Sequence, residues 1–153
     1  PLSLYRGYMP KASFASGDPW VSYVGNAEGD GIGCFAPCVV TTGNKFLSEK
    51  NSDKKAYDVS NMPVSTYEHY VDQGIPVILW GFIDMNVSDY VAWYYLHQGK
   101  YQPWYSFSHC LVLIGYTENT YIFCDPMRGI VEHSKAKVER SFQKNYSQAC
   151  IVK

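Results

Sequence analysis

The sequence lacks a long apolar run, an excess of one charge and any familiar metal-ligand spacing. No run of about 18 apolar residues occurs, which argues against a membrane-spanning helix. The net charge is −1, so no strong field favours binding to nucleic acid or to an anionic membrane. No Cys-x-x-Cys pair and no zinc-finger spacing is present. We therefore expect no metal, no other cofactor and no nucleic-acid partner.

A disulfide framework is also not indicated. The chain has five cysteines, an odd number that leaves at least one thiol unpaired. Cysteines within apolar strands usually behave as small hydrophobic residues, so a reduced state is the simpler expectation. The chain starts at Pro1 without an initiator Met, which suggests a fragment or a processed product. Any targeting signal would then lie upstream, and both cytoplasmic and exported locations stay open.

The composition is that of a globular protein, with 46% apolar and 18% charged residues. At 153 residues the chain is expected to form a single domain, residues 1–153, that is large enough for a hydrophobic core. Helical patterns precede most of the strand patterns, which predicts an α+β fold. The expected elements are a long ordered loop over residues 1–33, helices over 36–47, 66–73 and 135–145, and strands over 76–83, 91–96, 109–116, 121–125, 129–134 and 148–152.

Local signals support two of these elements. Ser65 and Glu68 have the spacing of a capping box at a helix start, and Gly74 supplies a stop. The run from Pro76 to Ile83 is almost continuously apolar, which is typical of a strand covered on both faces. We therefore expect residues 76–83 to form a central strand.

The most informative stretch is a predicted hairpin with His109 near its start and Asp125 at its end. If the connecting loop has an odd number of residues, Leu111 faces Asp125, and His109 is then the diagonal neighbour of Asp125 on the same face. A carboxylate in that place can accept the proton of one imidazole nitrogen and leave the other nitrogen as a base. The same residues could equally form a structural pair at the end of a hairpin.

A base needs a nucleophile to deprotonate, and Cys34 is the candidate within this chain. It follows Gly33 and directly precedes a predicted helix, where the helix dipole and free amides favour a thiolate. The order Cys, His, Asp also fits cysteine peptidases. Against this role, a cysteine at a glycine-flanked helix start is often a small buried residue.

These motifs, taken in order, resemble the bacterial C39-like peptidase family, papain-fold relatives of the bacteriocin-processing C39 peptidases. The resemblance runs along most of the chain, and the ordered set of motifs is more specific than any one of them. The matching stretches are Asp18-Pro19 with Gly25, Gly33-Cys34-Phe35-Ala36-Pro37, Gly74 to Trp80, His109 to Tyr116, Asp125-Pro126, Phe142, Tyr146 and Gln148-Ala149.

The resemblance implies a papain-like cysteine peptidase fold, with N-terminal helices followed by an antiparallel β-sheet. It implies that His109 is the general base and Asp125 its orienting carboxylate. In the family the nucleophilic cysteine lies on an N-terminal helix near a Gly-Cys-Glu type motif, usually preceded by a glutamine. Neither feature precedes Gly33-Cys34, so the resemblance places the nucleophile upstream of Pro1 and implies that this chain alone is inactive.

Two functions follow from these expectations. The first is a C39-like cysteine peptidase domain that hydrolyses peptide or amide bonds in a peptide or protein substrate. The alternative is a non-catalytic papain-like module that binds peptides or regulates a partner, with exposed aromatic residues lining a groove; the candidates are Trp93, Tyr94, Trp104 and Tyr105. The sequence at the nucleophile position distinguishes the two.

Overall fold

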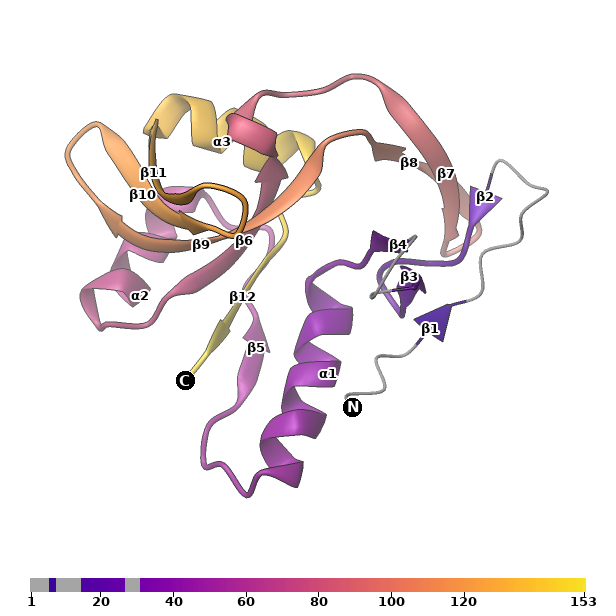
Figure 1. Ribbon diagram of the computed structural model, residues 1–153, viewed down its shortest axis with the longest axis horizontal. Helices are drawn as coiled ribbons and strands as arrows, with labels where there is room; N and C mark the ends of the chain where they lie inside the picture. The colour runs from indigo at the N-terminus through magenta and orange to yellow at the C-terminus, as the bar shows by residue number, and fades with distance from the viewer. Residues whose placement is uncertain (1–5, 8–14, 27–30) are drawn as a thin grey trace. The chain divides into compact units, whose positions relative to one another are not determined.

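The computed structural model describes residues 6–7, 15–26 and 31–153 (Figure 1). The chain divides into two compact units, each built from two segments. The first unit contains residues 1–55 and 89–106, and the second contains residues 56–88 and 107–153. Each unit is described by itself below. The expectation of one domain over residues 1–153 stays a prediction.

The first unit contains a long helix and two small sheets. The helix is α1 (Ala36–Glu49), which confirms the prediction for residues 36–47. One sheet has the order β1-β3-β4, and the other has the order β2-β7-β8. The strands are β1 (Arg6–Gly7), β2 (Ala15–Ser16), β3 (Tyr23–Gly25), β4 (Gly31–Gly33), β7 (Val91–His97) and β8 (Lys100–Tyr105).

The predicted long loop over residues 1–33 was wrong in the part that the structure describes, where four short strands form. The remainder of that prediction lies outside the described residues. Strands of two or three residues are too short to show apolar alternation in a sequence, and some form by pairing with segments that are distant in the chain. The parallel pairing of β2 with β7 is one such case.

Aromatic side chains form the core of the first unit. Phe35 is almost fully buried and stacks on Trp104, with ring centroids 5.1 Å apart. Trp20 and Tyr95 contact the same phenyl ring edge-on. Gly33 has φ +139°, and a Cβ there would lie 3.3 Å from the Trp104 ring. A glycine is therefore required where the chain turns from β4 into α1.

The second unit is built on a six-stranded sheet with the order β11-β10-β9-β6-β12-β5 (Figure 1). Its neighbouring strands are all antiparallel. The strands are β5 (Ala56–Asp58), β6 (Val77–Phe82), β9 (Ser108–Tyr116), β10 (Thr120–Asp125), β11 (Gly129–Ser134) and β12 (Ala149–Val152). β6 lies inside the sheet, which confirms the central strand predicted for residues 76–83.

One face of this sheet forms the main core. α3 (Lys135–Lys144) packs on it through Val138 and Phe142, which meet Leu79 and Leu111 of the sheet. The 3-10 helix η1 (Val64–Tyr67) adds Tyr67 to the same cluster. Alternate residues of β6 and β9 therefore enter the core, as the period of two requires.

The start of the second helix differs from the prediction. Residues 64–67 form η1, and the α-helical part, α2, is limited to Glu68–Asp72. Ser65 makes no capping bond, and the Glu68 carboxylate instead accepts hydrogen bonds from Tyr121 and Lys135. A tertiary ion pair thus replaces the local capping box. The predicted stop is confirmed, because Gly74 adopts φ +71°.

Replacing Phe123 by alanine should strongly destabilise the second unit. The ring is fully buried in the core, so its loss removes apolar contacts and leaves a cavity, at a cost of about 3–5 kcal/mol. Urea unfolding followed by circular dichroism measures the change. Phe107→Ala is the matched control, since that ring is 64% exposed and its loss should cost less than about 1 kcal/mol. Equal losses from both variants would contradict the placement of Phe123.

Candidate active site

His109 and Asp125 meet at the open end of the β9–β10 hairpin. His109 is the second residue of β9, and Asp125 is the last residue of β10. The imidazole Nε2–H donates a hydrogen bond to Asp125 Oδ1 over 3.0 Å. The two side chains predicted to be neighbours therefore form a direct contact within one unit.

The register of the hairpin explains this contact. Near the turn Tyr116 pairs with Tyr121, so the loop is one residue longer than the odd loop that we expected. A β-bulge at Ile114 then shifts the register, and Leu113 pairs with Phe123. The register near Asp125 is therefore the predicted one. Without the bulge, Asp125 would project from the opposite face to His109.

The Asp125 carboxyl is buried, with 3% of the residue exposed, and it is held by several donors. Burial by itself would disfavour the charged form of this group. Hydrogen bonds from the backbone amides of Met127 and Arg128 and from His109 outweigh burial, so the pKa of Asp125 is lowered from its ordinary value. The Met127 amide lies 2.7 Å from Oδ1. The carboxylate is therefore charged at neutral pH and can fix the imidazole.

The bond to Asp125 defines the tautomer of His109. Because Nε2 donates its proton, Nδ1 is the basic nitrogen of the neutral ring. No hydrogen bond to Nδ1 is found within the described part of the chain, and 11% of the side chain is exposed. This nitrogen can therefore accept a proton from another group.

A buried polar network that the sequence analysis missed supports the strands beside His109. Asn145 lies just beyond α3 and donates to the Gly81 carbonyl over 2.5 Å and to Ser108 Oγ over 2.9 Å. Gly81 pairs with His109 across β6 and β9. Asn145 therefore links β6 to β9 through hydrogen bonds next to His109. The only sequence signal was an asparagine between the matching residues Phe142 and Tyr146, which does not reveal such contacts.

Cys34 lies between β4 and α1 in the first unit, whereas the His109–Asp125 pair lies in the second. Phe35, not Cys34, is the N-cap of α1, and Pro37 occupies the first turn. The two neighbours of Cys34 in the sequence, Gly33 and Phe35, both pack against Trp104. This packing explains why these two residue types flank Cys34. The assignment of Cys34 as a nucleophile stays a prediction.

Cys110 follows His109 in sequence but has a different environment. Successive strand residues point to opposite faces, so its thiol does not share the face of the imidazole. Burial raises the pKa of the Cys110 thiol to about 12, and it raises that of Cys150 to about 12 as well. Both groups are therefore neutral thiols at physiological pH, which argues against either as a nucleophile.

Two of the other histidines, His69 and His97, and also Arg128 have partners outside the His109–Asp125 pair. His97 contacts Asp18 at 2.8 Å and stacks on Trp20, within the first unit. His69 contacts the Gln73 side chain. Arg128 forms an ion pair with Asp84 at 2.8 Å. Within the described residues no cluster of three or more potential metal ligands occurs, and no helix is long and apolar enough to cross a membrane.

Comparison with known proteins gives the family. A family model described as the Peptidase_C39 like family matches residues 5–150. The chain belongs to this family. No match was found among curated proteins.

A solved structure supports the fold of this C39-like family member. It is a crystal structure described as a candidate C39-like peptidase from Bacillus anthracis, with a TM-score of 0.83 and 20% sequence identity. The match covers 99% of this chain and 76% of that chain. The fold is therefore α+β and papain-like, as predicted.

The buried carboxylate should make stability depend on pH. A group with a lowered pKa stabilises the fold above its unfolded value, near 3.8, and this contribution is lost as pH falls through the folded value. Unfolding by urea at several pH values between about 5 and 2 should show a steeper loss in the wild type than in Asp125→Asn. Asp53→Asn, at an exposed residue, is the control and should follow the wild type. Parallel curves for all three proteins would contradict the role of Asp125.

Proposed function

We propose that this protein acts as a cysteine peptidase or amidase, with His109 as the general base and Asp125 as the residue that orients it. The hydrogen bond from His109 Nε2 to the buried, charged Asp125 carries the proposal, because it leaves Nδ1 as the proton acceptor. Membership of the C39-like family supports a peptide as the substrate.

The chemistry proceeds in two stages. Nδ1 of His109 takes the thiol proton, and the thiolate attacks the scissile carbonyl carbon to form a tetrahedral intermediate. The imidazolium then gives its proton to the leaving amine as the C–N bond breaks, which leaves a thioester. Water, deprotonated by Nδ1, hydrolyses the thioester and restores the thiol. Asp125 stabilises the imidazolium in both stages without taking its proton.

Two cysteines are candidates for the nucleophile. One is Cys34, the candidate within this chain. The other is a cysteine encoded upstream of Pro1, as the resemblance to the family implies. Iodoacetamide labelling of the full-length gene product at mildly acidic pH, followed by peptide mapping, distinguishes them, because a thiolate paired with an imidazole reacts fastest. The absence of any preferentially reactive cysteine would oppose the peptidase proposal.

A non-catalytic peptide-binding module is the second candidate function. Trp93 and Tyr94 of β7 are each 42% exposed, whereas Trp104 of β8 is buried against Phe35, so the expectation that Trp104 is exposed in a groove was wrong. Exposed aromatic side chains contribute strongly to peptide recognition. An alanine or serine at the upstream nucleophile position would favour this function. Peptide binding without turnover would then be the expected result.

Removal of the base should abolish most turnover. In the full-length gene product, His109→Ala should lower kcat for a fluorogenic peptide by about 10²- to 10⁴-fold, the usual contribution of a general base. His69→Ala, at an exposed histidine of α2, is the matched control and should leave the rate unchanged. A parallel assay of Cys34→Ala shows whether that thiol takes part. Unchanged kcat in His109→Ala would contradict the proposed base.

A further inference from the structure

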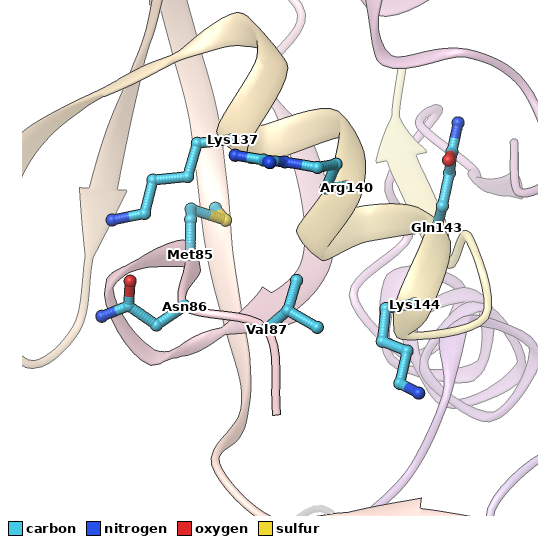
Figure 2. A pocket seen from close by; sticks show the side chains of 7 residues that line it. All are labelled: Met85, Asn86, Val87, Lys137, Arg140, Gln143 and Lys144. Atoms are coloured by element: carbon cyan, nitrogen blue, oxygen red, sulfur yellow. The ribbon is translucent and has the colours of Figure 1, made fainter. Parts of the chain in front are cut away.

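A hollow of the second unit lies apart from the residues used above. It is formed between α3 and the segment after the 3-10 helix η2 (Ile83–Met85), and its volume is about 600 Å³ (Figure 2). Figure 2 shows the side chains of α3 along one side and those of residues 85–87 along the other. The lining residues are Met85, Asn86, Val87, Lys137, Arg140, Gln143 and Lys144.

The hollow has a positive side. One face of α3 carries three positive charges, because helical spacings of three and four residues separate Lys137, Arg140 and Lys144. Within the described residues, neither Lys137 nor Arg140 has a carboxylate at salt-bridge distance. The first turn of α3 also contains no acidic residue to offset Lys137. Like charges at these spacings, and a cation at a helix start, are both mildly destabilising.

The opposite side of the hollow presents apolar atoms of Val87 and Met85 together with the polar side chain of Asn86. Val87 is 45% exposed, whereas Met85 is buried. Apolar atoms next to a row of cations fit a chain that presents both carboxylates and an aliphatic side chain. Of the described lining residues none is aromatic, so the hollow has no platform on which nucleic-acid bases could stack. The chain as a whole carries a net charge of −1, so the positive charge is a local feature.

From this arrangement we propose that the hollow is a docking site for an acidic peptide segment with an aliphatic residue among its carboxylates. The carboxylates pair with Lys137, Arg140 and Lys144, and the aliphatic side chain contacts Val87. The site involves neither His109 nor Asp125, and it stands whether or not the protein is a peptidase.

Fluorescence anisotropy of a labelled octapeptide of alternating glutamate and leucine, with the intact 153-residue chain, tests this site. The double variant Lys137→Gln/Arg140→Gln should weaken binding about fivefold or more. The matched control Lys54→Gln/Lys55→Gln removes two exposed positive charges elsewhere and should change the affinity by less than about twofold. Raising NaCl from about 50 to about 300 mM should weaken binding to the wild type.

A second variant tests the apolar side independently of the charges. Val87→Ser should weaken binding of the glutamate–leucine peptide and leave an all-glutamate peptide unaffected. The proposal is overturned if both double variants lose affinity equally, or if a peptide with glutamine in place of glutamate binds as well. Tighter binding of a single-stranded oligonucleotide of the same charge would also overturn it. Circular dichroism of each variant confirms that the fold is retained.

Discussion

The alternation of side chains along β9 and β10 decides which residues can meet at the open end of their hairpin. A strand places successive residues on opposite faces, so a shift of one residue in register changes every pairing. The bulge at Ile114 makes this shift between the turn and the site. It keeps Leu113 and Phe123 in the core, and it also brings His109 and Asp125 to one face. Packing and site geometry therefore depend on the same inserted residue.

Burial of the Asp125 charge is possible because its oxygens have fixed donors. An isolated carboxylate in an apolar environment would take up a proton, whereas this one receives bonds from backbone amides that follow it in the chain and from His109. The turn after β10 thus provides much of its solvation. Asp125 holds the imidazole of His109, and backbone amides hold Asp125 in turn. This limits the orientations that the imidazole ring can adopt.

The sequence predicted the elements whose signal is local and strong. Residues 76–83 are apolar throughout, and the structure confirms a central strand there. The hairpin was predicted for the same reason, but its loop length and bulge were not, because two compensating shifts leave the same pairing near Asp125. Glu68 has the spacing of a capping residue, yet its carboxylate binds Tyr121 and Lys135 from distant elements. The spacing of neighbouring residues in a sequence does not indicate such tertiary contacts.

The position of β12 determines when the sheet of the second unit can be completed during synthesis. This strand comes after every other strand of its sheet in the sequence, yet it lies between β6 and β5 in the interior of the sheet. During synthesis, β5 and β6 are complete long before the strand that joins them exists. Until then both present open backbone edges, which are prone to pair with other chains. The second unit can therefore complete its sheet only once residues 149–152 have been synthesised, and loss of these residues would leave a gap between β6 and β5.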